Sequence, residues 1–167
     1  YYFIGEAASC TFEHNGTVYF RATTPPRFEM PIFLKSINKM LNLPQRPAFA
    51  GHSKEPYPSQ WLLRRSREQL IRGHSLLSPL VEPLPNETEE AHIERMLLAV
   101  QNGDADLGPL GIWAPKKWDI FFHKNSIRGF KGYLEREKQK ADPDAAMAPA
   151  PHALVHQYNF QEELCYF

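Results

Sequence analysis

Proline is the feature that most constrains this chain: 15 of its 167 residues are proline, nearly double an average usage of about 5%. Each proline removes a backbone hydrogen-bond donor and biases the preceding residue away from helix. The prolines are spread along the chain, which predicts short helices joined by long extended connectors, notably over residues 43–57 and 74–86. We expect these connectors to be ordered either by the chain's own helices or by a partner.

Composition and charge exclude several classes of protein. The chain has 43% hydrophobic residues, which is too many for a disordered protein. Its 19 basic and 19 acidic residues give a net charge of zero, which argues against bulk nucleic acid as the main partner. Two cysteines exclude a disulfide-dense scaffold. The sequence has no apolar stretch of membrane-spanning length, so we expect no transmembrane segment of its own.

A β-hairpin is predicted over residues 10–21. Asn15-Gly16 is a strong signal for a two-residue turn, because this turn needs positive φ at both positions. The flanking segments are rich in strand-forming residues. The turn predicts three cross-strand pairs, which are His14 with Thr17, Glu13 with Val18 and Phe12 with Tyr19.

The remaining elements are predicted to be amphipathic helices, from apolar residues that recur at helical spacing. They cover residues 31–42, 58–73, 87–102, 115–123 and 126–140. We expect Gly73 to close the second helix, Asn86 and Glu89 to form a capping box before the third, and Ser126 to begin the last. His92 is expected on the exposed, polar side of the third helix.

These elements predict an α+β fold that is mostly helical, with short amphipathic helices, an N-terminal β-hairpin and long Pro-rich extended connectors. Residues 1–140 are predicted to form one small domain. Residues 141–167 are predicted to form a Pro/Ala linker and an aromatic C-terminal tail.

Two groups of residues are candidates for partner binding. The first is an arc on the helix over residues 58–73, opposite its apolar stripe, and it comprises Trp61, Arg64, Arg65 and Arg72. Trp and Arg are enriched at interface hot spots, although a solvated helix face explains the pattern equally well. The second group is the aromatic residues of the tail, Tyr158, Phe160, Tyr166 and Phe167.

Motifs for metal binding, nucleic-acid binding and catalysis are weak. His152, His156 and Cys165 offer a two-histidine spacing with a thiol, but four closely spaced ligands are usual in structural zinc sites, so no metal or cofactor is predicted. The segment Gly129–Gly132 has the GxxG pattern that KH domains use to clamp a nucleic-acid backbone. The sequence contains no catalytic motif of a familiar kind, which predicts a protein that is not an enzyme.

The function predicted from these observations is that of a non-catalytic structural (supernumerary) subunit of a large multiprotein assembly, bound to other protein subunits. Neutral charge and a first residue other than Met favour a mitochondrial respiratory-chain or ATP-synthase complex, hence a mitochondrial location. The alternatives are a soluble nucleic-acid-binding or ribosome-associated module, a viral or phage structural protein, and an enzyme whose site has no sequence signature.

Overall fold

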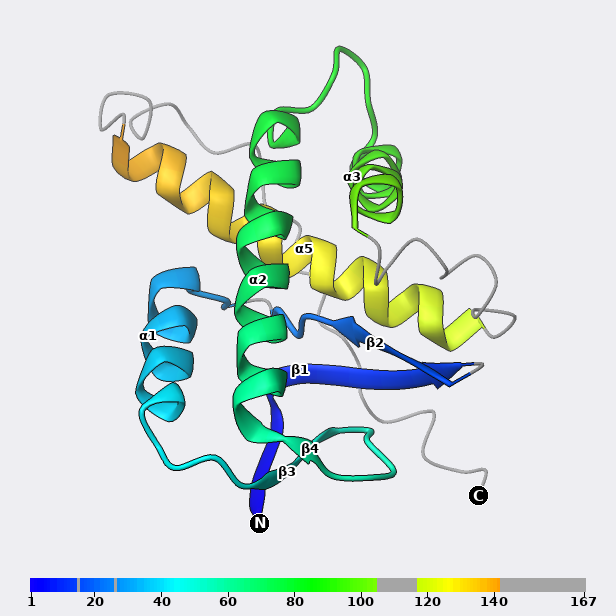
Figure 1. The fold of residues 1–167 in the computed structure, drawn as a ribbon. Helices are drawn as coiled ribbons and strands as arrows, with labels where there is room; N and C mark the ends of the chain where they lie inside the picture. The colour runs from blue at the N-terminus through cyan, green and yellow to red at the C-terminus, as the bar shows by residue number, and fades with distance from the viewer. Residues whose placement is uncertain (15, 26, 105–116, 142–167) are drawn as a thin grey trace, which may run out of the picture.

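The computed structural model of the chain describes residues 1–14, 16–25, 27–104 and 117–141. Its strands are β1 (Tyr2–His14), β2 (Thr17–Arg21), β3 (Pro47–Gly51) and β4 (Tyr57–Pro58). Its helices are α1 (Met30–Leu41), α2 (Ser59–Leu77), α3 (Glu89–Gly103) and α5 (Lys117–Ala141), with a short 3-10 turn η1 (Ser78–Leu80) after α2. The predicted α+β class, with an N-terminal hairpin and mostly helical content, is confirmed (Figure 1).

The four strands form one sheet in the order β2-β1-β3-β4. β1 and β2 are antiparallel with the three cross-strand pairs that the turn predicted, so the hairpin register is confirmed. The structure adds that β1 also pairs in parallel with β3. The connector predicted over residues 43–57 contains the whole of β3 and the first residue of β4. Their prolines do not prevent pairing, because Pro47 is the first residue of β3 and Pro58 lies on the edge strand β4.

α2 lies across one face of the sheet and contacts all four strands (Figure 1). Leu62 packs beneath Phe20, Ala48 and Ala50 of the strands, and all four are buried. The helix does not end at Gly73 as predicted but continues to Leu77. Gly73 is buried instead against α5, where an added Cβ would lie 3.3 Å from Cε2 of Phe130.

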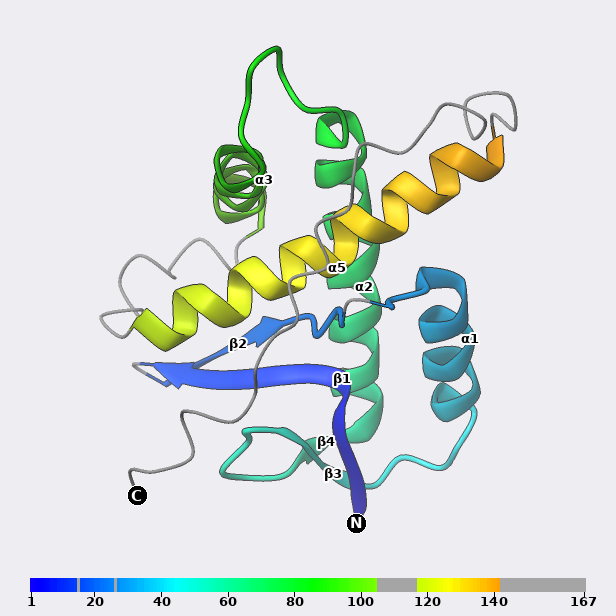
Figure 2. The same ribbon diagram turned by 180° about the vertical axis from the view of Figure 1, so that it is seen from behind.

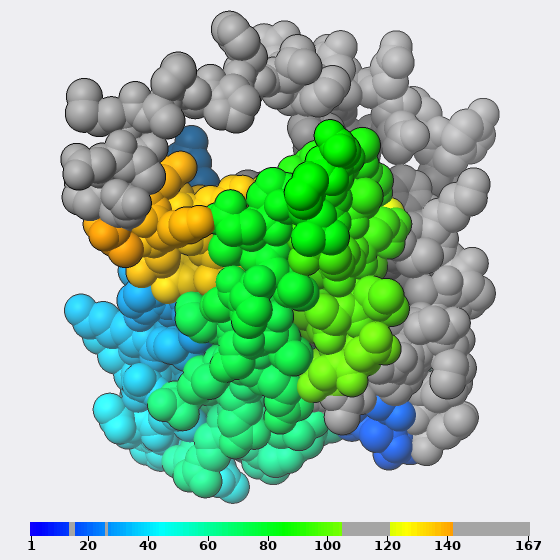
Figure 3. Space-filling model, turned by 90° about the horizontal axis from the view of Figure 1, so that it is seen from above, coloured from blue at the N-terminus to red at the C-terminus, as the bar shows by residue number. Residues whose placement is uncertain are grey.

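α3 packs beside the C-terminal part of α2 and against α5 (Figure 3). Thr88, not Asn86, caps α3, since its side chain accepts a hydrogen bond from Ala91 N. The prediction that His92 is exposed is also wrong. It is 1% exposed, and its Nε2 donates to the carbonyl oxygen of Leu80, 2.7 Å away. This contact holds η1 against α3, so much of the segment 74–86 is ordered by the chain itself.

The two helices predicted over residues 115–123 and 126–140 are one continuous helix, α5. Ser126 therefore does not begin a helix; its carbonyl oxygen accepts a hydrogen bond from Thr24 Oγ1. The GxxG pattern also lies inside α5 rather than in a loop between helices, so the interpretation as a KH loop is wrong. Gly129 serves close packing instead, because an added Cβ there would overlap the carbonyl oxygen of Thr24.

The main core lies between the four helices and includes Phe28, Ile37, Ile93 and Met96, all fully buried. No helix in the part of the chain that the structure describes is long and apolar enough to cross a membrane.

Candidate functional site

The candidate site lies where β1 bends (Figure 2). The pairing of β1 with β3 shifts register between Gly5 and Cys10. Gly5 and Ser9 have positive φ angles of 58° and 73°, and His52, which follows β3, has a φ of 61°. Positive φ is uncommon for residues other than glycine and carries strain, so Ser9 and His52 are unusual positions.

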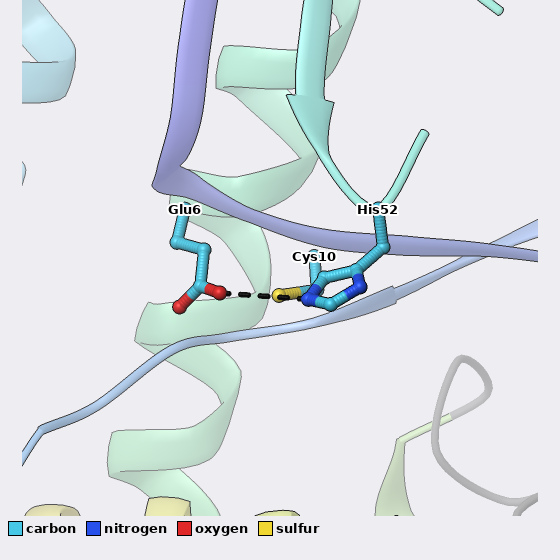
Figure 4. A group of neighbouring side chains, drawn as sticks. All are labelled: Glu6, Cys10 and His52. Carbon is cyan, nitrogen blue, oxygen red and sulfur yellow. Dashed lines mark ion pairs between the residues drawn. The ribbon is translucent and has the colours of Figure 1, made fainter. Parts of the chain in front are cut away.

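These distortions bring together three side chains of different chemistry, Glu6, Cys10 and His52. Their carboxylate oxygen, sulfur and ring nitrogen all lie within 4.8 Å of one another. Glu6 Oε1 is 3.5 Å from His52 Nε2. Figure 4 shows the three side chains directed toward one another from β1 and from the residue after β3.

Gly51 permits this close approach of the two strands. A Cβ at Gly51 would lie 2.8 Å from Glu6 Cγ and 3.4 Å from Cys10 Sγ. A larger residue at this position would therefore require the Glu6 side chain to shift. The ring of His52 is in turn stacked on Phe12, with centroids 6.3 Å apart and an interplanar angle of 15°.

A cavity of about 340 Å³ opens beside the cluster, lined by Glu6 and His52 on one side and by Phe122, Asn125 and Ser126 of α5 on the other. Arg21 also lines it, and is only 8% exposed. Its guanidinium lies over the rings of Phe12 and Phe122, with its Cζ 5.0 Å and 5.4 Å from their centroids. Cation–π contacts of this kind hold a buried charge in place.

The charge of Arg21 also affects His123 on α5. His123 is 4% exposed. Burial, with a smaller contribution from the positive charge of Arg21, lowers the pKa of His123 from 6.5 to about 3. His123 is therefore neutral at physiological pH, and Arg21 is the fixed positive charge of this region.

The cluster can hold a cation through oxygen, sulfur and nitrogen at once. Cys10 is fully buried and does not line the cavity, whereas Glu6 and His52 are exposed and do line it. The sulfur therefore lies on the inner side of the cluster, away from the cavity. Sequence analysis missed this cluster, because Cys10 lies in β1, His52 follows β3, and no ligand spacing connects them.

The predicted arc on α2 is only partly available to a partner. Trp61 is 38% exposed and packs edge-on against Phe20, with ring centroids 5.2 Å apart. Arg64 is exposed, but Arg65 lies over the ring of Phe20 at 5.3 Å. Arg72 is 3.7 Å from the buried carboxylate of Asp104. Arg64 also donates a hydrogen bond to Gln60 Oε1, 3.4 Å away, so all three arginines make contacts within the chain.

A second surface was not anticipated from the sequence. Tyr1 and Phe3 are 73% and 82% exposed, and both contact the ring of Phe49. Phe3 stacks on Phe49 with centroids 5.4 Å apart and an interplanar angle of 7°. Ala48 and Ala50 on either side of Phe49 are buried, so strand alternation turns this aromatic cluster away from α2.

The predicted aromatic residues of the tail, Tyr158, Phe160, Tyr166 and Phe167, lie outside the described residues, as do His152, His156 and Cys165. Comparison of the chain with protein-family models, curated proteins and solved structures gave no match.

Proposed function

We propose that this chain is a non-catalytic subunit that binds another protein of a larger assembly through the aromatic cluster of Tyr1, Phe3 and Phe49. The observation that carries the proposal is the 82% exposure of Phe3 beside two further aromatic rings. Full burial of one such side chain is worth about 1.5–3 kcal/mol, which the chain forgoes while the cluster faces water. Aromatic residues are enriched at the centres of protein interfaces.

A protein is favoured over a nucleic acid as the partner because the chain has no net charge. Most nucleic-acid affinity comes from Lys and Arg contacts to phosphates. Exposed aromatic rings can nevertheless stack on unpaired bases, so a nucleic acid is the alternative outcome of the test below. The mitochondrial location and the identity of the complex stay predictions from composition.

The test replaces Phe3 with a photo-crosslinking amino acid, and the variant chain is expressed in the protein's native cells. Leu84 is the matched control position, since it is 56% exposed and lies apart from the cluster, between η1 and α3. We expect a covalent adduct with one protein from position 3 and none from position 84. An adduct with nucleic acid, or equal labelling from both positions, would overturn the proposal.

A second experiment measures assembly directly. Phe3→Ser is expected to move the chain from high-mass fractions of a native extract to the monomer position in size-exclusion chromatography. Leu84→Ser should leave the elution unchanged. Because Phe3 contributes little to the core, the melting temperature of the purified variant should stay that of the wild type. Continued elution of Phe3→Ser at high mass would contradict the docking role.

A further inference from the structure

We infer that Glu6, Cys10 and His52 form a binding site for a zinc-class divalent cation, a property separate from the proposed docking role. The donor set combines a carboxylate oxygen, a cysteine sulfur and an imidazole nitrogen. Magnesium and calcium prefer oxygen ligands alone, so a set with sulfur and nitrogen disfavours them. Zinc accepts all three donors, and cobalt can replace it as a spectroscopic probe.

The spacing of the donors is close to what a tetrahedral site needs. Zinc–ligand distances of about 2.0–2.3 Å place neighbouring ligand atoms roughly 3.3–3.7 Å apart. Glu6 Oε1 and His52 Nε2 are already 3.5 Å apart. The whole set lies within 4.8 Å, so the sulfur is at most about 1 Å farther from the other two donors than a tetrahedral site requires. The side chain of Glu6 is 54% exposed and has room to shorten its distance to the sulfur.

The backbone around the site supports the same conclusion independently. Ser9 precedes Cys10 and has a φ of 73°, and His52 itself has a φ of 61°. Strained residues of this kind persist only where the surrounding structure holds them, and they gather at ligand sites. Here both distortions, and the close approach allowed by Gly51, serve to bring the three donors together. The stacking of His52 on Phe12 also fixes the orientation of the imidazole ring.

Three protein ligands leave a fourth coordination position. The buried sulfur lies on the inner side, and the cavity of about 340 Å³ lies beside Glu6 and His52. The fourth position therefore faces that cavity, where Arg21 and Asn125 also lie. An open position of this kind accepts water or a small anionic ligand, as zinc sites with three protein ligands do.

The test is a titration of the full-length chain with Co²⁺, followed by absorption spectroscopy, and with Zn²⁺ as the competitor. The titration is carried out on the wild type and on a Cys165→Ser chain, in which Cys10 is the one remaining thiol. We expect a thiolate-to-cobalt charge-transfer band that saturates at one cobalt per chain and disappears when zinc is added. A band that is present in the wild type but absent from the Cys165→Ser chain would place the metal in the tail and overturn the inference.

The other two ligands are tested with Glu6→Gln and His52→Gln. Losing an outer-shell partner of a metal ligand costs about 10–100-fold in affinity, so losing a direct ligand is expected to cost more than about tenfold. The matched controls are Glu55→Gln, in the same loop as His52, and His74→Gln on α2. Because Glu6 and His52 are exposed, both variants should keep the wild-type far-UV spectrum. Cobalt affinities equal to those of the controls would refute the site.

Discussion

Alanine at the two glycines of the GxxG pattern should have opposite effects on stability, and this tests the packing of α5. At Gly129, an added Cβ would overlap the carbonyl oxygen of Thr24 and lie 2.7 Å from the carbonyl oxygen of Pro25. Both are backbone atoms, so relief requires the connector after β2 to move. That movement would also break the hydrogen bond from Thr24 Oγ1 to the carbonyl oxygen of Ser126.

The magnitude follows from three opposing contributions. Overpacking costs about 1–3 kcal/mol and the lost hydrogen bond costs about 1 kcal/mol. Replacement of glycine by alanine inside a helix returns about 1 kcal/mol. Gly129→Ala should therefore lower the free energy of unfolding by about 2 kcal/mol. At Gly132 an added Cβ meets only the flexible end of Arg136, at 3.4 Å. Gly132→Ala should therefore raise the free energy of unfolding by about 1 kcal/mol.

The assay is urea denaturation followed by far-UV circular dichroism, supported by thermal melts. A separation of about 3 kcal/mol between the two variants corresponds to roughly 6–12 °C in Tm for a chain of this size. If Gly129→Ala proves as stable as Gly132→Ala, the connector after β2 does not lie against α5 and the packing argument is wrong.

Two further predictions concern protonation and capping. Because the pKa of His123 is lowered to about 3, the unfolded chain binds this proton more readily, and stability falls as the pH drops below 6.5. Between pH 7.5 and 5 the wild type should lose about 2 kcal/mol of unfolding free energy relative to His123→Gln, measured from urea titrations; parallel pH profiles would disprove this. Thr88→Ala should cost about 1 kcal/mol in the same assay, because Thr88 caps α3. Asn86→Gly should change the free energy of unfolding little, because Asn86 has a φ of 62°, which glycine adopts readily. If Asn86→Gly instead costs more stability than Thr88→Ala, Asn86 is the cap, as the capping box predicted.

Features that depend on neighbouring residues were predictable from the sequence. The Asn15-Gly16 turn set the register of β1 and β2, because a two-residue turn leaves a single way to pair its flanks. The apolar residues that recur at helical spacing likewise identified the buried face of α2, since Leu62, Leu63 and Leu70 are all buried.

Features that depend on distant partners were not predictable in this way. Gly73 and Ser126 carry local signals for helix ends, yet both lie inside helices, because packing between α2 and α5 outweighs those signals. His92 lies among glutamates in the sequence, which predicts exposure. In the structure it is buried, because its ring nitrogen donates a hydrogen bond to the carbonyl oxygen of Leu80.

The sequence by itself determined the α+β class, the hairpin and the apolar faces of the helices, since turn geometry and helical periodicity act over a few residues. Only the tertiary structure decided that β1 would bend and pair in parallel with β3. That pairing brings Glu6 and Cys10 to His52, and it exposes Phe3 beside Phe49. Parallel pairing joins segments with no short turn between them, so neither the cluster nor the aromatic surface has a local signal in the chain.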